Sequence, residues 1–296
     1  MRTSTWLKRY THSLNGKTVL ISGSTGGLGS ELCIYLASLD ASLVLLDRNP
    51  EKSNKLKNEL ISRFPSLSVT LVTADMENAE SVELACEKLK ELPIDIFISN
   101  AGAYSIPRRK CKSGYDNVFQ INFVSPYIII DRLLPKLRER GGRVVIVGSI
   151  SHNYSLSDAT DVDFSTRKSS ALVYGNSKRY LMFTLDRLFK NETEVGFAMT
   201  HPGISFTNIT NHYPKLIYAI IKNPMKIIFP PPRRACLSVL RGVFEDTHGL
   251  EWIGPRFFDV WGKPKKKRLH TVKDKELEYF DLWNKDSTLW ERKKQC

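Results

Sequence analysis

The sequence predicts an α/β fold with a single doubly wound, Rossmann-type parallel sheet and helices on both faces. Short apolar runs alternate with amphipathic stretches from residue 17 to residue 200, and a glycine-rich turn follows the first apolar run. The apolar runs are nearly continuous, as expected for strands that are buried on both faces. A chain of 296 residues with 42% hydrophobic residues can bury the core of such a domain.

Six strands are expected, one for each apolar run, at residues 17–23, 41–47, 67–75, 94–100, 142–149 and 194–200. The spacing of apolar residues predicts helices over residues 31–39, 50–64, 79–92 and 117–140, and a further helix around residues 173–181. No internal repeat or linker interrupts the pattern, so one domain is expected over residues 17–262. Residues 1–16 are interpreted as an N-terminal extension, and residues 263–296 as a basic, solvated loop and a helical tail.

The balance of charge is strongly basic, with 44 Lys and Arg residues against 31 Asp and Glu residues and a net charge of +13. Such a charge attracts anionic ligands, acidic membranes or nucleic acid, without choosing among them. The five cysteines are scattered and odd in number, so neither a disulfide framework nor a metal site is expected. No apolar run reaches the roughly 18 residues of a membrane-spanning helix, and we expect a soluble, cytoplasmic protein.

Tyr174 and Lys178 lie four positions apart in the stretch VYGNSKRYL. On a helix they share one face and lie roughly 6 Å apart along the axis. A lysine cation favours the phenolate form of a neighbouring tyrosine, so Lys178 is predicted to lower the pKa of Tyr174 and create a catalytic base. The alternative is a surface pair that shares this spacing by chance.

The glycine-rich turn is SGSTGGLG, residues 22–29. It stands between a predicted strand and a predicted helix, where bare backbone and helical amides can hold a pyrophosphate. The alternative is a tight loop without a ligand.

The second strand ends in Asp47 and Arg48. An acid there suits the ribose hydroxyls of NAD and an arginine suits the 2′-phosphate of NADP, so NAD is favoured and NADP stays open. Asp47 could instead cap the next helix.

These motifs, in this order, resemble the short-chain dehydrogenase/reductase family: the glycine turn, SNAG (residues 99–102), YGNSK and HPGISFT (residues 201–207). The resemblance covers roughly residues 15–262. The long insertion at residues 152–172 resembles the retinol-dehydrogenase-like and protochlorophyllide-reductase-like branches. The second glycine spacing, through Gly26, would suit sugar-nucleotide epimerases, but these usually carry a larger C-terminal domain.

The resemblance implies a catalytic set of Tyr174, Lys178, Ser149 and Asn122, with no metal. It also implies cofactor contacts along the glycine turn and at the ends of the later strands, at Gly23, Ser24, Thr25, Gly27, Leu28, Gly29, Asp47, Arg48, Asp75, Met76, Asn100, Ala101, Gly102, Tyr174, Lys178, Pro202, Gly203, Ile204 and Thr207. A substrate lid is placed at about residues 204–230. The long apolar helix around residues 121–134 and the helix around residues 173–181 are placed in a subunit interface, so a homo-oligomer is expected.

The expected function is therefore NAD(P)-dependent interconversion of an alcohol and a carbonyl group. The lid sequence is rich in Ile, Leu, Phe and Tyr, which suggests an apolar small-molecule substrate such as a lipid, steroid or retinoid. Its interspersed lysines suggest peripheral contact with an anionic membrane as an alternative role. A second hypothesis is a non-catalytic dinucleotide sensor or scaffold of the same fold. A nucleic-acid-binding protein is not favoured, because a lysine run alone does not make a base-stacking surface.

Overall fold

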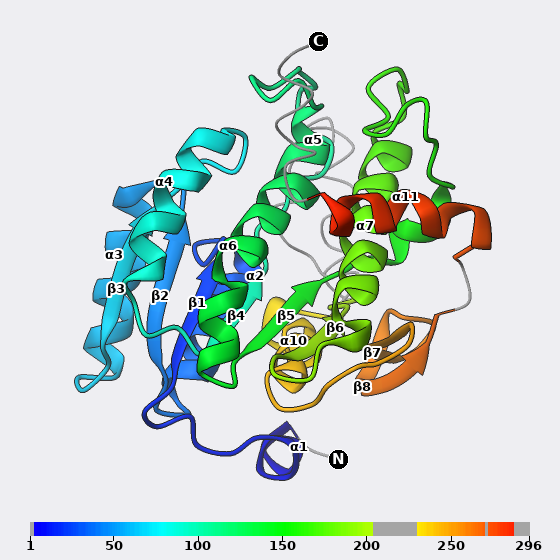
Figure 1. Cartoon of the computed structure of the whole chain (residues 1–296). Coiled ribbons are helices and arrows are strands. Elements are labelled where there is room, and N and C mark those ends of the chain that lie inside the picture. Colours follow the sequence, from blue (N-terminus) through cyan, green and yellow to red (C-terminus); the bar gives the residue numbers. More distant parts are fainter. Residues whose placement is uncertain (1–2, 204–229, 270–271, 287–296) are drawn as a thin grey trace, which may run out of the picture.

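The computed structural model describes residues 3–203, 230–269 and 272–286. Its centre is an eight-stranded sheet in the order β3-β2-β1-β4-β5-β6-β7-β8 (Figure 1). The strands are β1 (Thr18–Ser22), β2 (Ser42–Asp47), β3 (Val69–Thr73), β4 (Ile96–Ser99), β5 (Arg143–Val147), β6 (Gly196–Thr200), β7 (Glu251–Phe257) and β8 (Trp261–Arg268). All pairings are parallel except that of β7 with β8. The doubly wound sheet is thus confirmed, with an antiparallel strand added at one edge.

Helices cover both faces of the sheet (Figure 1). They are α1 (Thr3–Tyr10), α2 (Gly27–Ala37), α3 (Pro50–Arg63), α4 (Ala79–Lys90), α5 (Asn117–Phe119), α6 (Ser125–Glu139), α7 (Ser170–Leu188), α9 (Pro232–Ala235), α10 (Leu237–Gly242) and α11 (Asp274–Lys285). A π-helical turn, η1 (Gln120–Val124), and two 3-10 turns, η2 (Ile150–Tyr154) and η3 (Phe189–Asn191), complete the fold. In the described ranges no helix is long and apolar enough to cross a membrane. The predicted lid at residues 204–230 lies outside the described residues, apart from Pro230.

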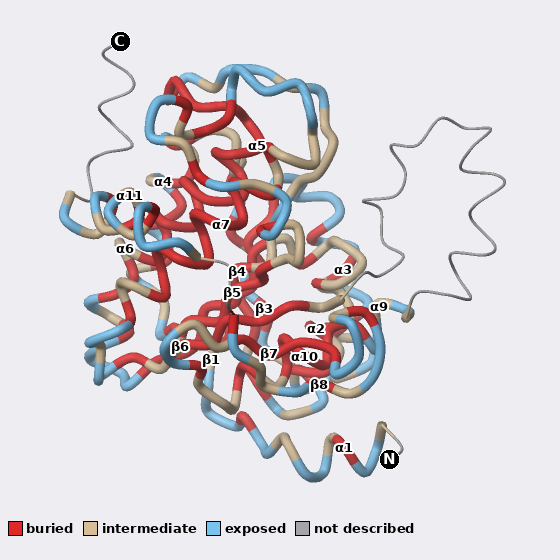
Figure 2. Tube along the Cα trace, turned by 90° about the vertical axis from the view of Figure 1, so that its right-hand side faces the viewer, coloured by how far each residue is buried: buried red, intermediate tan, exposed pale blue. Residues whose placement is uncertain are grey.

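The two faces of the sheet carry separate hydrophobic cores because side chains alternate along each strand. In β1, Leu20 packs with α4, α6 and α7, whereas Val19 and Ile21 pack with α2, α3 and α10. Figure 2 shows buried residues along the strands between the two layers. The N-terminal extension joins the second core, since Trp6 of α1 is fully buried there.

The single helix predicted over residues 117–140 is wrong at one point, because α5 and α6 are separated by the π-helical turn η1. Pro126 has no amide hydrogen for the carbonyl of Asn122, four residues earlier. The side chain of Asn122 enters the helical ladder instead, and its Nδ2 donates a hydrogen bond to the carbonyl of Val118 at 2.8 Å. Side chains that insert in this way interrupt a helix locally.

The interpretation of residues 263–268 as a solvated loop is wrong. They belong to β8, in which Lys266 pairs with Ile253 and Arg268 pairs with Glu251. The strand was not predicted from the sequence because a run of lysines is not typical of a buried strand. They are typical of an edge strand, where charge and proline discourage pairing with another chain.

The helical tail is present as α11, which packs across α6 and α7. The ring of Trp283 lies 4.6 Å from that of Phe123, and Tyr127 Oη donates to the carbonyl of Trp283 at 2.5 Å. Phe280 of α11 contacts Tyr180 of α7, with their ring centroids 5.2 Å apart. The helices for which we predicted a subunit interface are thus covered here by the same chain.

Candidate active site

The glycine turn joins β1 to α2 and brings bare backbone to the edge of the sheet. Gly23 has φ +68°, and a Cβ there would lie 2.9 Å from Ala101 Cα. A Cβ on Gly29 would lie 2.8 Å from Ser24 Cα, so no larger residue fits at these two positions. Gly27 and Leu28 stand in the first turn of α2, where unpaired amides attract an anion.

The end of β4 holds this turn in place. The side-chain amide of Asn100 donates to the carbonyl oxygens of Ser22 and Gly23, both at 3.0 Å. The hydroxyl of Ser22 in turn accepts from the backbone amides of Asn100 and Ala101, both at 3.1 Å. The strand order reverses between β1 and β4, and ligands of open α/β sheets bind at such a point.

Asp47 lies beneath the turn and is only 5% exposed. Its carboxylate accepts from the amide and the hydroxyl of Thr25, both at 3.1 Å, and from the hydroxyls of Ser24 and Ser53. It does not cap the next helix, because Asn49 caps α3 by accepting from the amide of Lys52 at 2.9 Å. Asp47 therefore fixes the turn, and the neighbouring Arg48 is the exposed charged group at this strand end.

The structure brings Tyr174, Lys178 and Ser149 together at the ends of β5 and α7. Lys178 Nζ lies 5.8 Å from the centroid of the Tyr174 ring and donates to the carbonyl of Val147 at 2.9 Å. Ser149 is near enough to Tyr174 to lower the pKa of the phenol, and its hydroxyl donates to that of Ser151 at 3.2 Å. The phenol, the hydroxyl and the ammonium group therefore surround one point at the carboxyl edge of the sheet.

The predicted direction of the Tyr174 pKa shift is wrong. Burial raises the pKa of Tyr174 to about 12; Ser149 opposes this rise and Tyr104 adds to it. Burial likewise lowers the pKa of Lys178 to about 8. Desolvation disfavours the charged form of each group and is the largest cause of both shifts. The phenol is consequently protonated at neutral pH.

Asn122 lies beside Lys178, next to Gly102. Its side chain accepts from the amide of Ala103 at 3.2 Å and donates to the carbonyl of Ala103 at 2.8 Å. A Cβ on Gly102 would lie 2.9 Å from Asn122 Oδ1 and 3.6 Å from Lys178 Nζ. A bare residue at position 102 thus lets the loop after β4 approach both side chains. The π-helical turn η1 places Asn122, and such turns recur at functional sites.

The remaining predicted cofactor residues are spread along the same edge. Asp75 Oδ1 accepts from the amide of Glu77 at 3.1 Å, and the carbonyl of Met76 accepts from the hydroxyl of Ser125 at 2.7 Å. Pro202 and Gly203 follow β6, with Gly203 at φ +83°. Ile204 and Thr207 lie outside the described residues.

Sequence reasoning missed Tyr104, whose ring meets that of Tyr174 edge-on with centroids 5.1 Å apart. It also missed two histidines behind the site. His152 Nδ1 lies 2.6 Å from the carbonyl oxygen of Ser149, and His201 stacks on Trp252 at 4.8 Å. The HPG motif could have drawn attention to His201. Nothing in the sequence marks Tyr104, which precedes a loop of unpredictable course.

A buried ion pair also lies behind the site and joins α7 to α11. Arg179 donates to both carboxylate oxygens of Glu276, at 3.1 and 2.5 Å, and their side chains are 1% and 0% exposed. Arg179 also donates to the carbonyl of His152 at 2.8 Å, and Glu276 accepts from the amide of Ser157 at 2.7 Å. These bonds tie the loop after Ser149 to α11.

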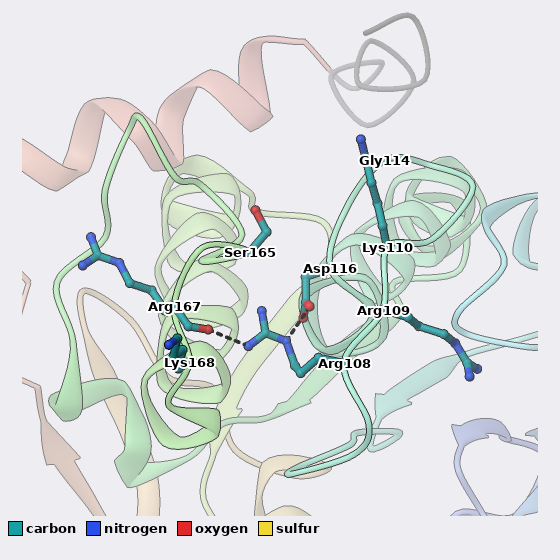
Figure 3. Close-up of a pocket in the computed structure, with 8 residues that line it drawn as sticks. All are labelled: Arg108, Arg109, Lys110, Gly114, Asp116, Ser165, Arg167 and Lys168. Atoms are coloured by element: carbon teal, nitrogen blue, oxygen red, sulfur yellow. Dashed lines mark hydrogen bonds and ion pairs between the residues drawn. The ribbon is translucent and has the colours of Figure 1, made fainter.

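A hollow of about 540 Å³ lies away from the glycine turn, between the loop after β4 and the 152–172 insertion. In Figure 3, Arg108 bridges Asp116 and the carbonyl of Arg167, with distances of 2.5 and 3.0 Å, while the Arg109 and Arg167 side chains point in opposite directions. Arg109 is paired with Glu77. Because its arginines are engaged within the protein, the hollow is a junction of two loops.

The residues present fit a dinucleotide. The turn offers bare backbone and helical amides, the switch point of the sheet lies beside it, and a phenol, a hydroxyl and an ammonium group stand at the far end of the same edge. Within the described ranges, no group of three or more His, Cys, Asp or Glu side chains could hold a metal ion.

Comparison with known proteins identifies relatives over the same region. The family model described as short chain dehydrogenase matches residues 17–160. Human polyprenol dehydrogenase is 25% identical over 281 residues, which cover 91% of this chain and 83% of its own length. Mouse retinol dehydrogenase 14 is 27% identical over 214 residues, covering 67% of this chain and 64% of its own length. A short-chain dehydrogenase from Sphingobium yanoikuyae, solved in complex with NADPH, has a TM-score of 0.59 at 19% identity, covering 76% of this chain and 84% of that one.

Proposed function

The chain belongs to the short-chain dehydrogenase/reductase family, and on that premise we propose that it interconverts an alcohol and a carbonyl group with NAD or NADP. The observation that carries the proposal is the meeting of Tyr174, Ser149 and Lys178 at the edge that also bears the glycine turn. A nicotinamide bound there would accept or supply the hydride. The chain's own residues would orient the substrate and move the proton.

Tyr174 is the proposed acid/base. Its raised pKa keeps the phenol protonated at neutral pH, which is the form that can protonate a developing alkoxide. Ser149, which lies beside Tyr174, would turn its hydroxyl from Ser151 and donate to the same oxygen as its charge develops. Lys178 is held by the carbonyl of Val147 and is a cation for most of its population at pH 7.

The proposed substrate is an apolar alcohol or its carbonyl counterpart. The relatives named polyprenol dehydrogenase and retinol dehydrogenase 14 bear the names of lipid alcohols. In this chain the ring of Tyr104 stands edge-on to that of Tyr174 and offers an apolar wall beside the reacting oxygen. A long, flexible apolar substrate is compatible with such a wall.

The test is a nicotinamide absorbance screen of long-chain alcohols, aldehydes, retinoids and polyprenols with both cofactors. Tyr174→Phe is expected to lower turnover about 10²–10⁴-fold, because it removes the proton donor. Cofactor affinity, measured by fluorescence titration, should be unchanged. Tyr10→Phe is the matched control, since Tyr10 lies on α1 in the N-terminal extension. Near wild-type turnover in Tyr174→Phe would refute the proposed role.

The same titration separates the two cofactors. Because Asp47 is engaged with the turn, Arg48 is the group available to a 2′-phosphate. Arg48→Ala should weaken NADPH binding about tenfold and leave NADH binding nearly unchanged. Equal losses for both would remove Arg48 from cofactor selection.

A non-catalytic sensor of the same fold is the second candidate. It would bind the cofactor and show no turnover with any member of the panel. All four side chains of the predicted catalytic set are present, which favours the enzyme.

A further inference from the structure

Exposed apolar side chains gather at one edge of the molecule. Seven large hydrophobic residues are exposed in the described ranges, and five of them lie in two segments, the one that follows β5 and the tip of the β7–β8 hairpin. They are Tyr154 (55%), Leu156 (38%), Phe257 (53%), Phe258 (86%) and Trp261 (43%). Scattered single apolar residues are normal on a surface, whereas a concentration on one edge marks a contact site.

The two loops stand at the same edge of the sheet. β5 and β7 both run parallel to β6, so the segments that follow them leave at the same side. The ring of His152 in the first loop contacts that of Trp252 in β7, with centroids 5.5 Å apart. A Cβ on Gly203 would lie 3.0 Å from Pro255 and 3.1 Å from the carbonyl of Val260. The exposed side chains therefore lie beside the segments that bear Ser149 and Gly203.

The turn between β7 and β8 holds its aromatic residue outward at a conformational cost. Phe258 and Asp259 have φ of 52° and 56°, in the left-handed region that glycine and asparagine usually occupy. Phe258 gains no burial in return, since it is 86% exposed. Because this backbone strain is not offset by packing of the Phe258 side chain within the chain, it points to a contact with another molecule.

The surroundings of the turn are basic. Residues 251–268 contain six Lys and Arg residues and two acidic ones. Asp259 is paired with Lys267, and Glu251 with Lys266. Arg256, Lys265 and Arg268 are exposed, and the guanidinium of Arg256 lies 5.4 Å from the centroid of the Phe257 ring. Aromatic residues flanked by cations are suited to the interface of an anionic membrane.

We propose that Tyr154, Leu156, Arg256, Phe257, Phe258 and Trp261 form a docking edge for an anionic lipid membrane. The aromatic and aliphatic side chains enter the headgroup region while the cations face the lipid phosphates and carboxylates. The docking edge adjoins the candidate active site. In a membrane-bound chain the active site would therefore lie next to the lipid phase in which apolar alcohols dissolve.

Two other occupants fit less well. A second copy that extends the sheet would have to pair with β8, whose lysines and Pro264 oppose strand addition. A single-stranded nucleic acid would need successive aromatic platforms in a basic groove, and Leu156 offers no stacking face.

The test is flotation of the full chain with phosphatidylcholine vesicles, with and without phosphatidylserine. The wild-type chain should float with the anionic vesicles, and less so at high salt because exposed charges are screened. Phe257→Ser/Phe258→Ser/Trp261→Ser should lower the bound fraction more than about tenfold, and Arg256→Glu about fivefold or more. Leu84→Ser on α4 is the matched control, because Leu84 is 69% exposed on another element and should make no difference.

A second measurement places the edge in the lipid. Vesicles with brominated acyl chains should quench the fluorescence of the bound wild-type chain, and Trp261→Phe should bind as well but lose much of the quenching. The proposal is overturned if the wild-type chain does not float with anionic vesicles, or if the triple serine variant floats as well as Leu84→Ser. Loss of a dimer or of RNA binding in the triple variant, without flotation of the wild type, would assign the edge to those partners. Flotation needs no turnover, so its failure would leave the proposed oxidoreductase function standing.

Discussion

Helix α11 and the β7–β8 hairpin both follow the last recognisable motif, yet they direct their aromatic residues in opposite ways. Phe280 and Trp283 of α11 are 0% and 4% exposed, whereas Phe257 and Phe258 of the hairpin are 53% and 86% exposed. α11 also buries its Glu276 against Arg179, while the hairpin leaves Arg256 in solvent. The same residue types therefore serve the core in one element and an outer contact in the other. The difference teaches that aromatic content alone does not distinguish a helix that packs on its own chain from a hairpin that contacts another molecule.

The largest expected effect is on the charge that α11 buries. Glu276→Ala should lower the free energy of unfolding by about 3–5 kcal/mol, because it leaves the guanidinium of Arg179 buried without a counter-charge. Glu278→Ala, at an exposed position of the same helix, should change it by less than about 0.5 kcal/mol. Urea denaturation measures both. Equal effects would mean that α11 is held no more tightly than a surface helix.

A second pair of substitutions compares the two elements directly. Phe280→Ala should cost about 3–5 kcal/mol of unfolding free energy, because it empties a fully buried site between α7 and α11. Phe258→Ala should change stability by less than about 0.5 kcal/mol. The same denaturation measurement serves. A large loss in Phe258→Ala would show that the hairpin tip is packed in solution and would break the comparison.

At neutral pH the smallest expected effect on stability comes from two histidines where the loop before α7 meets β7. Burial lowers the pKa values of His152 and His201 to about 4 from 6.5, and Arg179 further lowers that of His152. Between these pH values the unfolded chain binds more protons than the folded one, so stability falls as pH falls, with a slope of up to about 1.4 kcal/mol per pH unit for each histidine. Above pH 6.5 both are neutral in either state and contribute no slope.

His152→Asn tests this dependence, because the asparagine amide can still donate to the carbonyl of Ser149. Denaturation curves measured from pH 4 to pH 7 should lose up to half of the histidine slope. An unchanged slope would mean that His152 is already accessible to protons in the folded chain.

The parts of the fold that sequence predicted are those with local signals. β1 to β6 are apolar, β-branched runs bounded by turns, and the glycine turn, Tyr174 and Lys178 have spacings that local geometry fixes. β8 was missed because its run of consecutive lysines lacks the apolar alternation of a strand. The π-helical turn was missed because it depends on the side chain of Asn122 entering the ladder.

The electrostatics of the site could not be predicted in the same way. The spacing of Tyr174 and Lys178 gives their separation, but the shift of each pKa depends on how deeply the fold buries them. The role of Asp47 beneath the turn depends on which hydroxyl groups donate to its carboxylate. One of them, that of Ser53, comes from α3 and not from the glycine turn. Arg179 and Glu276 are 97 residues apart, and no local pattern joins them.

That separation has a consequence for biosynthesis. When α7 leaves the ribosome, its guanidinium has no counter-charge until a further 97 residues have been made. At about 5–20 residues per second, the delay is roughly 5–20 s. During that interval the nascent α7 and its neighbour expose the aromatic face that α11 later covers. A chaperone that binds apolar surfaces would have its best opportunity there, and sequence changes that slow translation over this stretch would lengthen the exposure.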